Sequence, residues 1–293
     1  MSKVRNYLSL IKFSHTIFAM PFAFIGFFTG LMSLDHKTDI WKETYLIRLL
    51  LVIACMVFAR SAAMAFNRYL DRSFDAKNPR TAIREIPAGI IKANSVLLFT
   101  ITNCILFTAC TFFINSICFY LSPVALLVVL GYSYTKRFTP FCHLVLGIGL
   151  SLAPIGAYLA VTGIFSLLPI LFSLVVIFWV SGFDIIYALQ DVDFDQSQQL
   201  YSIPSWLGKG KALHVSELLH LVSGMAVIIA GLDGHFSWFY WAGAMIFLSM
   251  LIYQHLVIKP TDLRRVNLAF MTTNGIASVV FAIFVITDLL IHS

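Results

Sequence analysis

Two groups of aspartates at helical spacing stand out in this apolar chain. The first is the pattern N-x-x-x-D-x-x-x-D, formed by Asn67, Asp71 and Asp75. Residues four positions apart lie on one face of a helix, so the three side chains share a face. Carboxylate and amide oxygens are the ligands that a hard cation such as Mg2+ prefers. This face is a candidate metal-binding surface.

The second group lies more than a hundred residues later in the pattern D-x-x-Y-A-x-x-D-x-x-x-D. Its acidic residues are Asp184, Asp191 and Asp195, and Tyr187 lies between them. On one continuous helix these carboxylates at i, i+7 and i+11 form a single stripe. Ionised groups at the ends of apolar helices are costly in a membrane and need partners. We therefore predict a second oxygen-ligand face.

A basic loop follows the first group. Pro79 ends the helix, and Lys77, Arg80 and Arg84 lie on either side of it. Metal ions held by carboxylates can bridge a diphosphate, and arginine or lysine can neutralise the remaining oxygens. Two aspartate groups beside a basic loop thus predict a magnesium-diphosphate site. The alternative is that these charges form solvated ion pairs at the membrane interface.

A third candidate is Tyr132 with Lys136, four residues apart and therefore on one helix face. Lys136 could reach a phosphate oxygen while the Tyr132 hydroxyl donates a hydrogen bond. Aromatic and basic residues at a helix end are also ordinary interfacial anchors.

Composition sets the class of protein. Of 293 residues, 59% are hydrophobic and only 12% are charged, whereas a globular protein has about 25% charged residues. We predict an all-α, polytopic membrane bundle forming one domain over residues 1–293. Nine apolar segments are each close to the ~20 residues that cross a bilayer: 16–34, 45–66, 94–115, 117–134, 141–162, 166–188, 211–231, 236–257 and 266–290. The break between the third and fourth is the least marked, because only Asn115 and Ser116 interrupt the apolar run.

The distribution of basic residues predicts the orientation. With these nine segments, 17 of the 20 Lys and Arg residues fall on one side, and only Lys37, Lys42 and Arg48 fall on the other. Cytoplasmic loops carry the excess of Lys and Arg, so the N-terminus and both aspartate groups should be cytoplasmic and the C-terminus external. This orientation also accounts for the net charge of +6 without a nucleic-acid partner. The bacterial inner membrane is the expected location, with an uncleaved first span.

The five cysteines and the histidines show no metal-ligand spacing. We expect the cysteines to be reduced and structural. The histidines, including His143, should be packing or interfacial residues.

The two aspartate motifs and the basic loop resemble those of the UbiA family of intramembrane aromatic prenyltransferases. The resemblance covers nearly the whole chain. Arg80 and Arg84 match the family's loop arginines, Tyr132 and Lys136 its Y-x-x-x-K element, and residues 202–204 its S-I-P tract. Segments 13–21 and 60–67 are similar to the 4-hydroxybenzoate polyprenyltransferase branch, including its relatives assigned to menaquinone made through futalosine. Glu85 is a departure, because it follows Arg84 where the family usually has proline.

The resemblance implies a Mg2+-dependent enzyme that transfers a polyprenyl group from polyprenyl diphosphate to an aromatic acid in ubiquinone or menaquinone synthesis, with its prenyl tail in membrane lipid. The implied Mg2+ ligands are Asp71, Asp75, Asp191 and Asp195, with Asn67 and Asp184 beside them. The implied diphosphate ligands are Lys77, Arg80, Arg84, Tyr132 and Lys136.

The acceptor carboxylate needs a cation of its own. Arg60 lies seven residues before Asn67 on the same helix face, deeper in the membrane, and Arg137 adjoins Lys136. Both could bind an aromatic carboxylate through a bidentate fork, and Tyr187 is a third candidate for acceptor contact. Arg60 is favoured slightly, and its alternative role is an ion pair with Asp184 or a carboxylate of another helix.

Two alternative functions remain. Another member of the family would use a different acceptor, such as a dihydroxynaphthoate. A cation-coupled transporter would also hold carboxylates within the membrane. However, these aspartates cluster at one face, and the opposite loops supply no comparable polar path.

Overall fold

The structure is a computed structural model that describes residues 3–12, 18–34 and 43–292. Segment 13–17, which carries part of the family resemblance, and the loop with Lys37 and Lys42 lie outside the described residues. The described chain is helical and contains no strand. Its helices are α1 (Lys3–Leu10), α2 (Met20–Met32), α3 (Glu43–Asp75), α4 (Ala93–Ile114), α5 (Ser116–Thr135), α6 (Cys142–Thr162), α7 (Leu167–Ala188), the 3-10 turn η3 (Leu189–Asp191), α8 (Val192–Ser197), α9 (Ile203–Leu207), α10 (Lys209–Asp233), α11 (Trp238–Val257), the π-helical turn η4 (Leu268–Thr273) and α12 (Asn274–His292).

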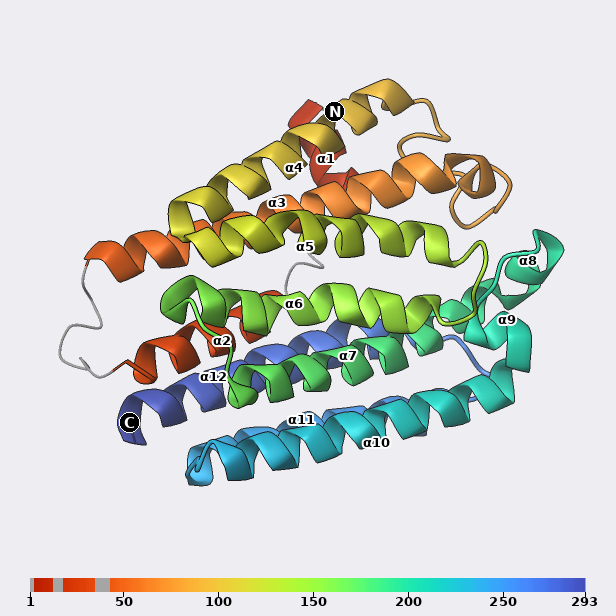
Figure 1. Cartoon of the computed structure of the whole chain (residues 1–293). Coiled ribbons are helices and arrows are strands. Elements are labelled where there is room, and N and C mark those ends of the chain that lie inside the picture. The colour runs from red at the N-terminus through yellow and green to blue at the C-terminus, as the bar shows by residue number, and fades with distance from the viewer. Residues whose placement is uncertain (1–2, 13–17, 35–42, 293) are drawn as a thin grey trace.

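The long helices run side by side as one bundle (Figure 1). Among the described residues, eight helices are long and apolar enough to cross a membrane, and α2 is a shorter apolar helix. These nine elements correspond to the nine predicted segments and confirm the all-α membrane architecture. With 13 residues, α2 spans about 20 Å, less than the ~30 Å hydrocarbon core.

Asn115 forms the break between the third and fourth segments. Its backbone is extended between α4 and α5, and its side-chain oxygen accepts a hydrogen bond from the Cys118 N–H at 2.9 Å. Its amide nitrogen donates to the Leu159 carbonyl at 2.8 Å. A single residue thus ends one helix, caps the next and attaches the turn to α6.

An aromatic core joins α2, α7, α11 and α12. Trp179 is fully buried and packs against Phe22 and Phe247, with ring centroids 5.4 and 5.7 Å away. Offset and edge-to-face ring pairs of this kind add to the stabilisation from apolar burial. This core fixes α7, which carries the start of the second aspartate motif.

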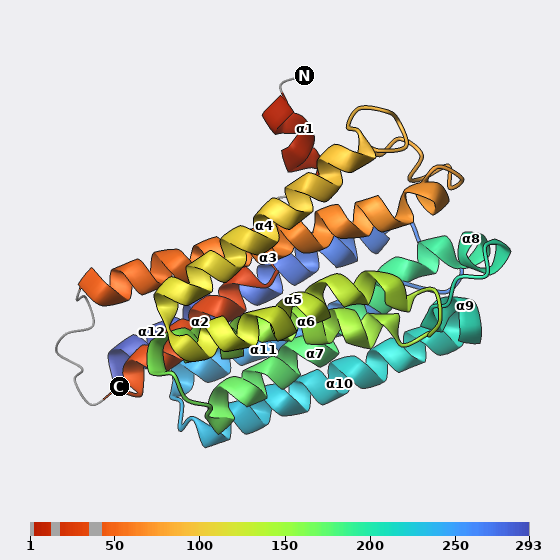
Figure 2. The same cartoon turned by 45° about the horizontal axis from the view of Figure 1, so that its top comes forward.

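Both aspartate motifs lie at the same end of the bundle. The loop after α3 and the short helices α8 and α9 cluster there, whereas the described C-terminal residues lie at the opposite end (Figures 1 and 2). The first motif lies on a continuous helix, as predicted. The second motif lies on a helical segment that continues to Ser197 but is not a regular α-helix throughout, because the chain tightens into η3 between α7 and α8.

Candidate active site

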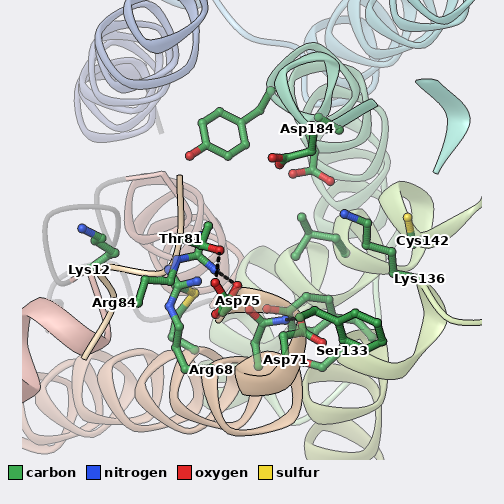
Figure 3. A pocket seen from close by; sticks show the side chains of 18 of the residues that line it. Lys12, Arg68, Asp71, Asp75, Thr81, Arg84, Ser133, Lys136, Cys142 and Asp184 are labelled. Atoms are coloured by element: carbon green, nitrogen blue, oxygen red, sulfur yellow. Dashed lines mark hydrogen bonds and ion pairs between the residues drawn. The ribbon is translucent and has the colours of Figure 1, made fainter. Parts of the chain in front are cut away.

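A cavity of about 560 Å³ opens among the two motifs and the basic loop. It is lined by every predicted site residue except Lys77: Arg60, Asn67, Asp71, Asp75, Arg80, Arg84, Tyr132, Lys136, Arg137, Asp184, Tyr187, Asp191 and Asp195. Asp71 and Asp75 lie across the cavity from Asp184 (Figure 3). Lys77 is exposed and donates instead to the Gln198 side chain at 3.2 Å. The fold therefore brings together side chains that are far apart in the sequence.

The first motif is held by its own helix and loop. Asn67 donates to Asp71 at 3.0 Å. Arg84 returns from the loop, and its Nη1 lies 2.6 Å from Asp75 Oδ1. The Thr81 hydroxyl donates to the Asp75 carbonyl at 3.1 Å. The loop thereby folds back over the end of α3 and places an arginine in the cavity.

Arg80 joins the two motifs. Its guanidinium forms a bidentate ion pair with Asp191, in which Nε lies 3.1 Å from Oδ1, and it also donates to the Tyr187 hydroxyl at 3.1 Å. Burial opposes the charged form of Arg80, but the Asp191 carboxylate outweighs burial and raises the pKa of Arg80. Arg80 therefore remains a cation at physiological pH.

Lys136 and Ser202 hold the last aspartate of the second motif. Lys136 Nζ lies 2.7 Å from Asp195 Oδ1, and the Ser202 hydroxyl donates to Oδ2 at 3.1 Å. Ser202 also caps α9 by accepting from the Ser205 N–H at 3.1 Å. Burial opposes the charge of Lys136, but the fully buried Asp195 carboxylate outweighs this effect and raises the pKa of Lys136.

Asp184 is held by a residue that sequence reasoning assigned to packing. His143 Nδ1 lies 2.6 Å from Asp184 Oδ2, and His143 Nε2 accepts a hydrogen bond from the Ile203 N–H at 3.4 Å. The backbone donor fixes the tautomer, so Nδ1 carries the proton that Asp184 accepts. Gly147 permits this contact, because a Cβ at Gly147 would lie 2.5 Å from the Ile177 carbonyl oxygen of α7. His143 is thus a positioning residue within the site.

The two candidate acceptor arginines differ in their contacts. Arg137 Nη2 lies 3.3 Å from Asp71 and donates to the Leu70 carbonyl at 3.0 Å. Arg60 lines the cavity, and its buried Nε has no hydrogen-bond partner. Across the described residues Arg60 makes no ion pair, and the carboxylate of Asp184 binds His143 instead. Of the two, Arg60 is available to a carboxylate from outside the protein.

The two aromatic candidates have different surroundings. The Tyr187 ring packs on Phe270 with centroids 4.3 Å apart, and its hydroxyl faces Arg80. Tyr132 lines the cavity beside the buried Ser133. The cavity therefore has aromatic side chains on two of its walls.

The carboxylates suit a hard divalent cation. No preformed cluster of three or more His, Cys, Asp or Glu ligands exists in the part of the chain described. Asp75 Oδ2, however, is buried and lacks a hydrogen-bond partner. A buried, unsatisfied carboxylate oxygen is costly unless a ligand completes it. The oxygen-donor set therefore fits Mg2+.

Comparison with known proteins identifies the family. Residues 17–276 match the UbiA prenyltransferase family. The chain belongs to the UbiA family. It is therefore an enzyme of the transferase class, and the transporter alternative is not supported.

Named relatives and solved structures agree with this UbiA assignment. Over 254 residues the chain is 31% identical to 4-hydroxybenzoate octaprenyltransferase of Aeromonas salmonicida, with 86% of this chain and 85% of the relative covered. It is also 31% identical to the enzyme of the same name from Tolumonas auensis, covering 80% and 82%.

Two archaeal UbiA homologues share the fold. The apo structure from Aeropyrum pernix K1 superposes with a TM-score of 0.79 at 27% identity, covering 94% of this chain and 97% of that one. The homologue from Archaeoglobus fulgidus bound to DMAPP and Mg2+ gives a TM-score of 0.76 at 19% identity, covering 98% and 99%. The predicted UbiA-like fold is confirmed.

His143 and Arg68 are buried polar residues of the cavity in this UbiA protein that sequence reasoning did not place in the site. Both line the cavity and both are buried, with exposed fractions of 2% and 8%. Arg68 carried a signal, because an arginine so close to the end of an apolar helix needs a partner. His143 carried none, because its partners Asp184 and Ile203 lie on other elements.

Proposed function

We propose that this UbiA protein transfers a polyprenyl group from polyprenyl diphosphate to 4-hydroxybenzoate, with Mg2+, in quinone biosynthesis. The observation that carries the proposal is the balance of charges in the cavity. Four carboxylates face four cations, in the pairs Asp71–Arg137, Asp75–Arg84, Asp191–Arg80 and Asp195–Lys136. A magnesium diphosphate supplies both partners at once, cations for the carboxylates and an anion for the basic residues. The named relatives support the choice of acceptor.

The carboxylates of both motifs would hold Mg2+. Asp71 and Asp75 would bind from one side of the cavity and Asp191 and Asp195 from the other. Asn67 and Asp184 would support these ligands. When bound, Mg2+ would neutralise part of the diphosphate charge and make it a better leaving group.

The basic residues would stabilise the leaving group. Arg80, Arg84 and Lys136 would exchange their aspartate partners for diphosphate oxygens, and Tyr132 would donate a hydrogen bond from the cavity wall. The allylic carbon–oxygen bond breaks, and the electron pair leaves with the diphosphate. The resulting allylic cation must be kept from water, and a cavity within a helix bundle does this.

The acceptor would enter with its carboxylate toward Arg60, and Tyr187 and Arg137 would complete its surroundings. An electron-rich phenol ring would attack the allylic cation ortho to its hydroxyl, a carbon–carbon bond would form, and the ring proton at that carbon would pass to the released diphosphate. Arg60 can fix this geometry through a bidentate fork. The prenyl tail would extend into the lipid that surrounds the bundle.

A panel of substrates tests the function. Purified protein should prenylate 4-hydroxybenzoate with Mg2+ and lose this activity in excess chelator. The Arg60→Ala variant should raise KM for 4-hydroxybenzoate and leave KM for the diphosphate unchanged, while an acceptor without the carboxylate is little affected. The binding free energy of 4-hydroxybenzoate should fall by about 2–3 kcal/mol, the usual contribution of a charge-assisted hydrogen bond. Faster turnover of a dihydroxynaphthoate by wild type would reassign the acceptor, and full activity in chelator would reject Mg2+.

The cytoplasmic orientation is part of the same proposal. Ala76 lies at the site end of the bundle and Asp233 at the end of α10, and both are exposed. With the native cysteines removed, Ala76→Cys should react with a membrane-impermeant thiol reagent only from the cytoplasm, and Asp233→Cys only from outside. External labelling of Ala76→Cys in intact cells would reverse the orientation.

A further inference from the structure

Arg68 is a buried cation that the proposed function does not use. It lies on α3 next to Asn67, lines the cavity, and is 8% exposed. Its Nε is buried without a hydrogen-bond partner. Within the described residues no carboxylate forms an ion pair with it. A buried arginine in this state loses its hydration without full compensation.

Arg68 has a second arginine as its neighbour in the cavity. Figure 3 places Arg68 beside Arg84 and Asp75. Asp75 Oδ1 is already engaged by Arg84 at 2.6 Å, and the charge of Arg84 acts directly on Arg68. Two guanidinium groups therefore lie near the Asp75 carboxylate, and of these Arg84 forms the ion pair. Neighbouring arginines that line a cavity in this way favour an anion with several oxygens.

Glu85 supplies the remaining negative charge. Its side chain is buried, accepts a hydrogen bond from the Ser9 hydroxyl of α1 at 2.5 Å, and acts on Arg68 electrostatically. This is the residue at which the loop departs from the family pattern. Its carboxylate is held by α1 instead of pairing with Arg80 or Arg84, so the phosphate loop keeps both arginines for a ligand.

We infer that Arg68 is a further diphosphate-binding residue, which acts with Arg84 on the oxygens of the prenyl diphosphate, and that Glu85 balances part of its charge. The inference rests on the proposed function for its choice of ligand. It gives the buried Nε a partner, and it explains why a cation lies in the cavity next to the first aspartate motif. The prenyl donor supplies the only highly charged anion in the proposed reaction, so the diphosphate is the ligand chosen.

Direct binding of inorganic diphosphate tests the inference without requiring turnover. Calorimetric titration of the detergent-solubilised protein with inorganic diphosphate in the presence of Mg2+ should show Arg68→Met binding about 10- to 100-fold more weakly than wild type. Arg68→Lys should recover part of the affinity. In kinetics, Arg68→Met should raise KM for the prenyl diphosphate and leave KM for the acceptor unchanged.

Arg72→Met is the matched control. Arg72 lies on the same helix one turn later, is exposed, and donates from Nη1 to the Tyr69 carbonyl at 2.6 Å, with its guanidinium over the Tyr69 ring. It should bind diphosphate like wild type. Glu85→Gln should bind a few-fold more tightly, because removal of a nearby negative charge favours an anion. Weaker binding by Glu85→Gln would overturn the role of Glu85 as a balancing charge.

The outcomes separate the two proposals. Unchanged diphosphate affinity in a folded Arg68→Met protein, or a rise in acceptor KM alone, overturns the assignment of Arg68. If Arg68→Met does not purify as a folded protein, the test uses Arg68→Lys. Wild-type affinity of Arg68→Lys for inorganic diphosphate, together with a wild-type KM for the prenyl diphosphate, would reject Arg68 as a diphosphate-binding residue. If wild type binds magnesium diphosphate with the expected dependence on Arg68 but prenylates no aromatic acid, only the proposed acceptor chemistry fails.

Discussion

The two aspartate motifs perform matching parts of one site but are supported in different ways. The first motif ends a single α-helix, and its cation Arg84 returns from the loop that follows, nine residues after Asp75. The second motif spans the end of α7, the turn η3 and α8. Its partners Arg80, Lys136 and His143 all come from other parts of the chain. The first motif is built mainly by local structure, with Arg137 as a distant partner of Asp71, and the second depends more on tertiary contacts.

Burial is deepest at the last aspartate of each motif. The side chain of Asp75 is 8% exposed and that of Asp195 is fully buried, whereas Asp71 and Asp184 keep 28% and 24%. A buried carboxylate needs its partners in place, because an unpaired charge costs more in the interior than at the surface. Arg84 follows Asp75 in the next loop, but Lys136 reaches Asp195 from the end of α5, so the second motif should be more sensitive to changes outside it.

The largest effects are expected from the carboxylates themselves. Asp71→Asn, Asp75→Asn, Asp191→Asn and Asp195→Asn each remove a charge while nearly preserving volume, and each should lower kcat/KM by about 100- to 1000-fold, as the loss of one preorganised electrostatic group does. If both motifs hold one magnesium diphosphate, the double variant Asp75→Asn with Asp191→Asn should lose little more than either single variant. The measurement is initial rate in detergent or liposomes at saturating Mg2+.

Two outcomes would contradict a shared site. Additive losses of activity in the double variant would mean that the two motifs act on separate steps. Near-wild-type rates for both Asp71→Asn and Asp191→Asn would mean that the two motifs do not form the active site. Asp262→Asn serves as the control, because Asp262 forms an ion pair with the exposed Arg264 and is not among the residues that line the cavity. It should keep wild-type activity.

An intermediate effect is expected from the supports of each motif. His143→Leu removes the donor to Asp184 and the acceptor for Ile203. It should lower the stabilisation of the transition state by about 1–3 kcal/mol, because a buried polar group loses its partner. His143→Asn keeps a donor near the position of Nδ1 and should recover part of the loss. In the first motif, Thr81→Val removes one hydrogen bond to a backbone carbonyl. It should lower the stabilisation of the transition state by about 1 kcal/mol or less.

Kinetics and thermal unfolding together decide this prediction. His143→Leu should lower kcat more than it raises KM, because Asp184 is misplaced within an otherwise intact cavity. Equal effects of His143→Leu and Thr81→Val on activity would contradict the claim that the second motif depends more on tertiary contacts. A fall in unfolding temperature without any change in kcat would make His143 a structural residue only.

The same division decides what the sequence could predict. Spacing alone predicted the helix that carries Asn67, Asp71 and Asp75, because i, i+4 periodicity is a local property. It placed Asp191 on the same side as Asp184, and both line the cavity, but it did not predict the turn η3 that ends at Asp191, because one tightened turn leaves no periodic signal. The contact between His143 and Asp184 could not be predicted, since it depends on how closely α6 approaches α7 at Gly147. Basic residues were predicted as a group, but only the structure separates Arg80 from Lys77.

The smallest effect on kcat/KM is expected from a change of Lys77, which lies in the loop between the two aspartate motifs. Arg80 and Lys77 both reach from the loop after α3 toward α8, but Arg80 binds Asp191 of the second motif in the cavity, whereas Lys77 binds Gln198, beyond the motif and outside the cavity. Exposed polar contacts contribute only about 0–1 kcal/mol, so Lys77→Gln should keep kcat/KM within about twofold of wild type. Arg80→Gln leaves Asp191 without its cation and should lower kcat/KM at least about tenfold.

Both variants are measured with the prenyl diphosphate varied at saturating acceptor. A Lys77→Gln loss as large as that of Arg80→Gln would mean that Lys77 turns toward the diphosphate during the reaction, and the loop would then contribute three cations to the site instead of two.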